Sequence, residues 1–250
     1  MAIKDLEALV ASISHALNAA RIPCVLWGHC LLQVHGVPTI VGSIDFVIPD
    51  DLLQAGARVL TDVALAQDTL LTPCPNPTDC SKTAPNRPTP PPSFHNHLEG
   101  SDASVGLYLQ RDTLWFLPPL NSMRDRLLSP ATQQLPPPFI LASDQTTLPP
   151  WRPGRASGFF KPGQSPVVVP KAHVLLEAFM RIYARDVGTV IGSFALTMIA
   201  YMELYVDEDG FLDVDQLPDH LKELYCERRN DKKPVRQWTQ ELKETLGQNP

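Results

Sequence analysis

The sequence predicts a mixed α/β protein, with a small sheet flanked by helices and a helical C-terminal region. Two observations favour this α/β (α+β) class. Short apolar runs alternate with helical patterns between residues 25 and 64, and apolar residues recur at helical spacing after residue 167. A chain of 250 residues with 44% hydrophobic content is large enough to bury such a core.

We expect three regions along the chain. An α/β core occupies residues 1–128, an irregular proline-rich connection or lid occupies 129–166, and a helical region with a C-terminal helical layer occupies 167–250. A proline-rich insertion at 72–92 interrupts the core. Because proline lacks the N–H that a helix or inner strand uses, this insertion should be exposed.

The elements of the core follow from the spacing of apolar residues. In chain order they are a helix at 3–20, a strand at 25–27, a helix at 29–35, a strand at 39–48, a helix at 50–64 and a hairpin at 104–117 that turns at 110–112.

Four helices are expected after the irregular connection, at 171–186, 187–206, 213–225 and 234–246. The segment 187–202 has no charged residue, but it is shorter than the ~20 residues that cross a bilayer. We therefore expect a buried helix there and no membrane partner.

Charge and cysteine content narrow the functional classes. A net charge of −6 argues against a broad nucleic-acid surface, which needs clustered Lys and Arg. The N-terminus carries Asp5 and Glu7 and lacks the pattern of a secretory signal. Five cysteines in such a chain favour reduced thiols, so we expect a cytoplasmic protein.

The stretch from Val25 to Asp51 carries the most specific pattern. An apolar strand ends at Trp27-Gly28, a helix follows, and a second strand contains Gly42–Val47 (GSIDFV). This order resembles the nucleotidyltransferase fold, the superfamily of DNA polymerase beta and the aminoglycoside nucleotidyltransferases. More narrowly, it is similar to a group of fungal proteins with this fold, through Trp27-Gly28, Gly36–Thr39 (GVPT) and Asp45–Val47 (DFV).

The resemblance implies a site in which two acids, two residues apart on one strand, hold Mg²⁺ ions against a nucleoside triphosphate. Here Ser43 stands at the first acid position, so Asp45 is the one remaining carboxylate, and His29 replaces a small residue after Gly28. Magnesium binds mainly through carboxylates and phosphates. We therefore expect a degenerate metal motif, with Mg²⁺ as a cofactor if nucleotide binding is retained.

The leading hypothesis is a degenerate nucleotidyltransferase-fold protein that binds a small molecule in a cleft beside Asp45. Asp45 and His29 are the candidate catalytic residues, because a carboxylate and an imidazole can act as acid or base. Trp27, Gly28 and Ser43 are the candidate ligand contacts.

Three other functions are possible alternatives. The sequence does not decide whether the chain is an enzyme. The first is an active Mg²⁺-dependent nucleotidyltransferase. The second is a reassigned fold that acts as an isomerase or cyclase in fungal secondary metabolism. The third is a non-enzymatic protein whose proline-rich segments bind partner proteins.

A second group of candidate ligands lies in and beside the proline-rich insertion: Cys74, Cys80, His95 and His97. Two cysteines and two histidines suit tetrahedral zinc, which could organise a segment too polar to fold alone. The Cys-x5-Cys spacing differs from that of the common zinc knuckles. The alternative is that these are ordinary loop residues.

Overall fold

The computed structural model describes residues 5–62, 70–75, 80, 89–124, 135–230 and 233–248. The chain divides into two compact units. The first comprises Met1–Arg87 and Pro91–Pro170, and the second comprises Pro88–Pro90 and Lys171–Pro250. Much of the predicted insertion at 72–92, the start of the predicted connection at 129–166, and the ends of two predicted helices (residues 3, 4, 63 and 64) lie outside the described residues.

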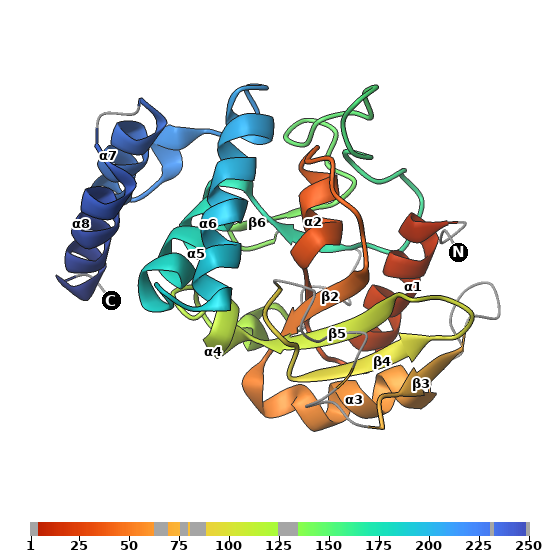
Figure 1. The fold of residues 1–250 in the computed structure, drawn as a ribbon. Helices are drawn as coiled ribbons and strands as arrows, with labels where there is room; N and C mark the ends of the chain where they lie inside the picture. The colour runs from red at the N-terminus through yellow and green to blue at the C-terminus, as the bar shows by residue number, and fades with distance from the viewer. Residues whose placement is uncertain are drawn as a thin grey trace. The chain divides into compact units, whose positions relative to one another are not determined.

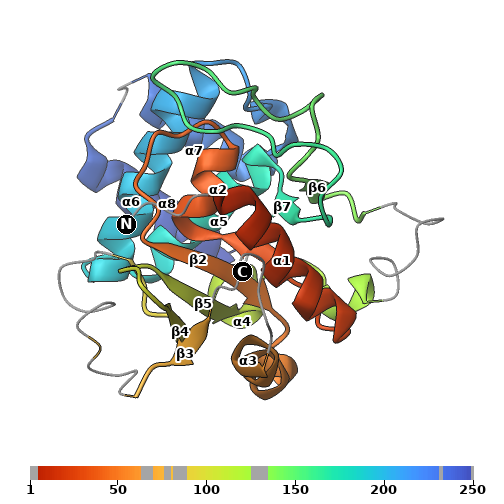
Figure 2. The same ribbon diagram turned by 90° about the vertical axis from the view of Figure 1, so that its right-hand side faces the viewer.

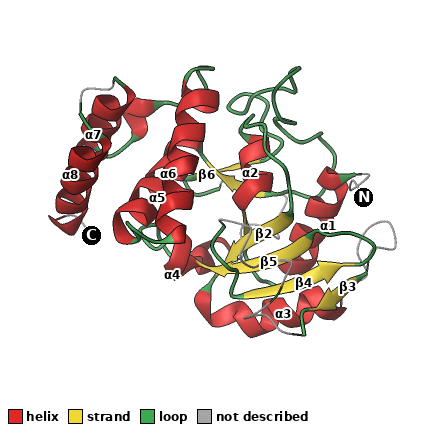
Figure 3. Cartoon of the chain, in the orientation of Figure 1, coloured by secondary structure: helices red, strands yellow, loops and turns green. Residues whose placement is uncertain are grey.

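A five-stranded mixed sheet forms the centre of the first unit (Figures 1 and 3). Its strands are β1 (Val25–Trp27), β2 (Ser43–Ile48), β3 (Leu71–Pro73), β4 (Phe94–Leu98) and β5 (Ser104–Leu109). Their spatial order is β1-β2-β5-β4-β3, with β2 parallel to β5 and the other neighbours antiparallel. This sheet and its flanking helices confirm the predicted α/β (α+β) class.

The helices around this sheet are α1 (Leu6–Ala19), α2 (Gly28–Val34) and α3 (Leu53–Asp62), the last preceded by the 3₁₀ turn η1 (Asp50–Leu52). Helices α1 and α3 lie together on one face of the sheet (Figure 2). Gly56 lets α3 approach closely, since a Cβ there would lie 3.0 Å from Leu107 and 3.1 Å from Ile48. Alternate strand residues face opposite sides, so Asp45 and Gly106 point to the other face.

The chain leaves β5 through a short helix, α4 (Gln110–Thr113), so the predicted hairpin at 104–117 is wrong. The side chain of Gln110 organises this turn. Its Oε1 accepts a hydrogen bond from the Leu120 N–H at 2.9 Å. Its Nε2 donates at 3.0–3.3 Å to the carbonyls of Leu114, Leu117 and Pro118. One buried amide therefore supplies hydrogen-bond partners to backbone groups of the chain that follows α4.

The described part of the first unit also contains η4 (Leu120–Met123), β6 (Phe139–Leu141) and β7 (Val168–Pro170). Strands β6 and β7 pair antiparallel in a separate two-stranded sheet. The irregular chain between them is fixed to the end of α2. The Gly158 N–H donates to the Gln33 carbonyl at 3.0 Å, and the Ala156 N–H donates to the Gly36 carbonyl at 3.4 Å.

The second unit is helical. Its elements are α5 (Ala172–Arg185), α6 (Val190–Tyr201), the π-helical turn η6 (Met202–Asp207), the 3₁₀ turn η7 (Val214–Gln216), α7 (Asp219–Arg229) and α8 (Val235–Gln248). Buried Trp238 of α8 stacks on Tyr183 of α5, with ring centroids 5.7 Å apart. Its Nε1 donates to the Leu224 carbonyl of α7 at 2.9 Å. One side chain therefore joins three helices.

Helix α6 and η6 form a continuous helix, Val190–Asp207, that passes a length and composition test for a membrane span, with a mean hydropathy of 1.3. Core helices pass the same test. Phe194 and Met198 are buried in this unit. Asp207 is also buried, accepts a hydrogen bond from the Tyr225 hydroxyl at 2.8 Å and lies 3.1 Å from Arg229. The helix is partly buried rather than fully buried as predicted: 44% of this segment lies inside the structure, and Val190 and Leu204 are exposed.

Candidate functional site

Asp45 lies inside β2, on the sheet face opposite α1 and α3. Its register partners are Trp27 on β1 and Gly106 on β5. Only 4% of Asp45 is exposed. A carboxylate removed from water in this way is costly unless polar groups and suitable space surround it.

Two glycines supply that space. A Cβ on Gly28 would lie 2.7 Å from the Oδ2 of Asp45, and a Cβ on Gly106 would collide with its Oδ1. Gly28 also has a φ of +67°, a backbone conformation that favours glycine. The start of α2 and the neighbouring strand β5 therefore both leave room for the same carboxylate.

Ser43 supplies a polar partner. It lies two residues before Asp45 on the same face of β2, and its hydroxyl donates to the Oδ2 of Asp45 at 2.6 Å. Strand β5 contains no acid, and within the described residues Asp45 belongs to no group of metal-ligating side chains. A single carboxylate with a hydroxyl neighbour does not fit a pair of Mg²⁺ ions.

The other predicted site residues surround the junction of β1, α2 and β2. Trp27 is buried opposite Asp45, and Gly28 begins α2. His29 follows in α2, where its Nδ1 is hydrogen-bonded to the Thr39 hydroxyl at 2.7 Å. The structure therefore brings Trp27, Gly28 and Ser43 next to Asp45, and it links His29 to the loop that precedes β2.

Three further residues near Asp45 were missed by the sequence reasoning: Cys30, Gly106 and Tyr108. Burial, followed by the charge of Asp45, raises the pKa of Tyr108 and of Cys30, so both side chains stay protonated near neutral pH. A glycine inside a strand pattern is a recognised signal of close approach and could have identified Gly106. Cys30 and Tyr108 carry no such local signal.

The strand register continues this row of residues across the sheet. Gly106 is paired with His95 on β4, and the N–H of Cys74, just after β3, donates to the His95 carbonyl at 3.4 Å. Directly paired residues share a face, so Asp45, Gly106, His95 and Cys74 form one cross-strand row. Since neighbouring strands lie about 4.8 Å apart, the backbones of Asp45 and His95 are separated by about 10 Å.

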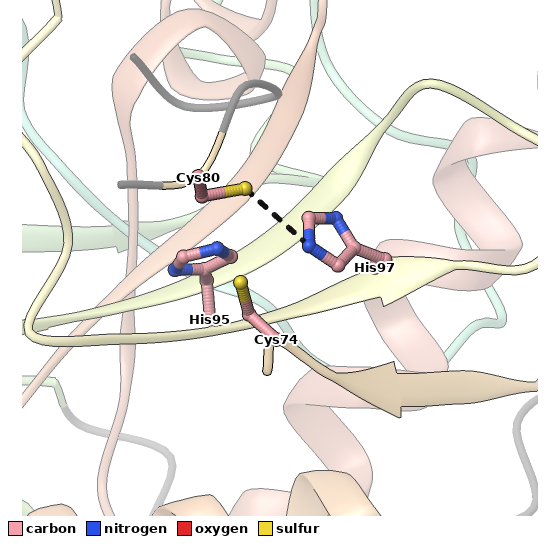
Figure 4. Close-up of side chains that lie close together, drawn as sticks. All are labelled: Cys74, Cys80, His95 and His97. Carbon is pink, nitrogen blue, oxygen red and sulfur yellow. Dashed lines mark hydrogen bonds between the residues drawn. The ribbon is translucent and has the colours of Figure 1, made fainter. Parts of the chain in front are cut away.

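The end of this row belongs to a group that we call the Cys/His cluster: Cys74, Cys80, His95 and His97 (Figure 4). The two sulfur atoms and one ring nitrogen of each histidine lie within 4.8 Å of one another. The two imidazole rings meet edge to face, with centroids 5.2 Å apart. Burial, followed by the proximity of His97, lowers the pKa of His95. The fold therefore gathers the four residues that the sequence had identified as candidate metal ligands.

Comparison with known proteins gives little further information. No protein-family model matches the chain, and no characterised protein sequence matches it. A solved structure, that of the antibiotic-resistance factor ANT(2'')-Ia, aligns with 81% of this chain and 90% of its own chain. The sequence identity is 12% and the TM-score is 0.32, a similarity too low to carry an argument about the site.

Proposed function

We propose that the first unit binds a small molecule beside Asp45 and does not catalyse standard two-metal nucleotidyl transfer. The observation that carries this proposal is the 2.6 Å hydrogen bond from Ser43 to Asp45. A hydroxyl stands where a second carboxylate would be needed, and it neutralises no metal charge. One carboxylate is insufficient to hold two Mg²⁺ ions against a triphosphate.

The chemistry of Asp45 limits the class of ligand. Carboxylate oxygens accept hydrogen bonds, so ligands with N–H or O–H groups suit a contact with Asp45. His29, which follows Gly28 on α2, is the candidate acid or base. The narrower placement of the chain in a fungal branch of nucleotidyltransferase-fold proteins rests on the motifs of residues 27–28, 36–39 and 45–47 alone.

The absence of two-metal transfer can be tested by restoring the second acid. Wild-type protein, Ser43→Asp and the neutral control Ser43→Asn are titrated with Mg²⁺ and each of ATP, GTP, CTP and UTP by calorimetry. They are then assayed for transfer of labelled nucleotide to amine and hydroxyl acceptors. We expect no transfer by the wild type and a gain of Mg²⁺-dependent nucleotide affinity in Ser43→Asp alone. Mg²⁺-dependent transfer by the wild type that Asp45→Asn abolishes would show an active nucleotidyltransferase instead.

Small-molecule binding is tested separately by thermal shift with a panel of amines and polyols. We expect one or more compounds to stabilise the wild type, and Asp45→Asn to lose that stabilisation. The control Asp62→Asn changes an exposed acid at the end of α3 and should retain it. Equal responses from wild type and Asp45→Asn to every compound would contradict binding beside Asp45.

A further inference from the structure

The pairing of β3 with β4 places three side chains of the Cys/His cluster in one small region. His95 and His97 are two residues apart on β4, so their rings lie on the same face of the sheet. Cys74 lies opposite His95, because its N–H extends the hydrogen-bonded ladder to the His95 carbonyl. The backbone alone therefore sets the positions of these three residues.

The fourth side chain comes from a separate part of the chain. Cys80 is 7% exposed, and its Sγ lies 3.5 Å from the Nε2 of His97. Figure 4 shows both sulfur atoms beside the two imidazole rings, with Cys80 and Cys74 approaching from different segments.

The distances suit a tetrahedral ion. Zinc lies about 2.3 Å from sulfur and about 2.0 Å from nitrogen, so the ligand atoms of a tetrahedral site are about 3.3–3.8 Å apart. The four ligand atoms here lie within 4.8 Å of one another, so small side-chain rotations would close them around an ion. Two sulfurs and two nitrogens select zinc over magnesium or calcium, which prefer oxygen.

His95 supplies an independent observation. Its side chain is 2% exposed, and its Nε2 has no hydrogen-bond partner within the described structure. A buried nitrogen without a hydrogen-bond partner is destabilising, which is why such atoms are uncommon. A metal ion bound at the centre of the cluster would give this nitrogen a ligand bond.

We propose that Cys74, Cys80, His95 and His97 bind a single Zn²⁺ ion that stabilises the fold. Four protein ligands leave no open position for a substrate, which is the arrangement of structural zinc sites. Two thiolates balance the charge of the ion. The zinc ties the chain at Cys80 to β3 and β4, on the sheet face that carries Asp45, and it does so whether or not Asp45 binds a ligand.

Zinc content tests the proposal directly. Full-length protein is purified without chelator, and its metal is measured by mass spectrometry alongside that of variants. Wild-type protein should contain one zinc ion per chain, and Cys80→Ser and His95→Gln should lose it. The controls change the same residue types outside the cluster: Cys226→Ser on α7 and His15→Gln on α1 should retain zinc. Equal zinc in the wild type and in both cluster variants would overturn the proposal.

A second measurement needs no variant. Zinc is removed from the wild-type protein with chelator under reducing conditions, and Co²⁺ is added. We expect the intense visible bands of tetrahedral, thiolate-bound cobalt, their loss on addition of Zn²⁺, and alkylation of Cys74 and Cys80 in the metal-free form alone. Absence of zinc together with absence of these bands would refute the site. A Cys74–Cys80 disulfide in the freshly purified chain would refute it as well, because the thiolates would already be consumed.

Discussion

At the scale of single residues, Asp45 constrains the identity of its neighbours. Its two carboxylate oxygens lie where the side chains of Gly28 and Gly106 would otherwise be, and its Oδ2 accepts the Ser43 hydroxyl hydrogen. The three small residues and the acid therefore form one packed unit. Substitutions at these positions should therefore have non-additive effects on the free energy of unfolding.

The clash at Gly106 gives a first prediction. Gly106→Ala should lower the free energy of unfolding by about 1–3 kcal/mol, because the new Cβ collides with Asp45 and lies 3.1 Å from Pro92. In an Asp45→Ala background the same change should cost much less. Urea unfolding of the four proteins of this double-mutant cycle measures the coupling. Additive effects of the two changes would show that the carboxylate does not occupy this space.

The order and spacing of a sequence motif identified Asp45, Ser43 and Gly28. Gly106 could have been suspected from the sequence, because its strand was expected. No local pattern gives the register between β2 and β5, however, and this register places Gly106 next to Asp45. Cys30 and Tyr108 become part of the site through burial next to a charge, which is a property of the folded chain. Local sequence does not encode such proximity.

At the scale of elements, Trp238 of α8 contacts both α5 and α7. Trp238→Ala should lower the free energy of unfolding of the second unit by about 3–5 kcal/mol, because it empties a buried site and removes the hydrogen bond to Leu224. Trp238→Phe retains a stacked ring and should cost less. Hydrogen exchange of α7 and α8 reports the change locally.

Trp151 provides the matched control for that experiment. It is 68% exposed, so Trp151→Ala should leave the exchange of α7 and α8 unchanged. If Trp238→Ala also left that exchange unchanged, α8 would be held by contacts other than this ring.

Apolar spacing reports the buried face of a helix or strand, and it predicted the long helices and strands β1, β2 and β5. It did not predict β3, β4, β6 or β7. The predicted hairpin after β5 failed for a definable reason. Its turn is stabilised by four hydrogen bonds of one side chain, Gln110, to backbone groups up to ten residues away. Strand β6 was not predicted because it has three residues and lies in a proline-rich segment. A strand this short shows no detectable periodicity.

At the scale of the whole molecule, buried His35 should make the stability of the first unit depend on pH. Its Nε2–H donates to the Pro170 carbonyl at 3.0 Å, which joins the end of α2 to β7. Burial lowers the pKa of His35 from 6.5 to about 4. Between these values the unfolded chain binds a proton that the folded chain does not, so stability is highest above pH 6.5 and is lost as pH falls towards 4.

The pKa difference of His35 also sets the size of the expected loss of stability. A shift from 6.5 to about 4 corresponds to a loss on the order of 3 kcal/mol across this range. His35→Gln keeps a donor for Pro170 but cannot titrate, so its unfolding free energy should vary less with pH. His15→Gln, at an exposed position of α1, should keep the wild-type dependence. Identical pH profiles for wild type and His35→Gln would show that His35 is not neutral and buried in the folded chain.

The Cys/His cluster shows why some features emerge only at this largest scale. The sequence identified all four residues, yet their spacing matched no common zinc motif. The pairing of β3 with β4 brings Cys74 opposite His95, a contact across 21 positions of the chain. Cys80 then joins them from a third segment. Ligand spacing along the chain therefore carries little information when a sheet arranges the ligands.

The strand order also bears on self-association. Among the described strands, β1 and β3 lie at the two ends of the sheet, and each is three residues long. An exposed strand edge is a template on which another chain can add, and the hazard grows with its length. Strand β3 ends at Pro73, which has no N–H to offer. The longer, more apolar strands β2 and β5 lie inside the sheet with both edges paired, so the sheet presents little edge for aggregation.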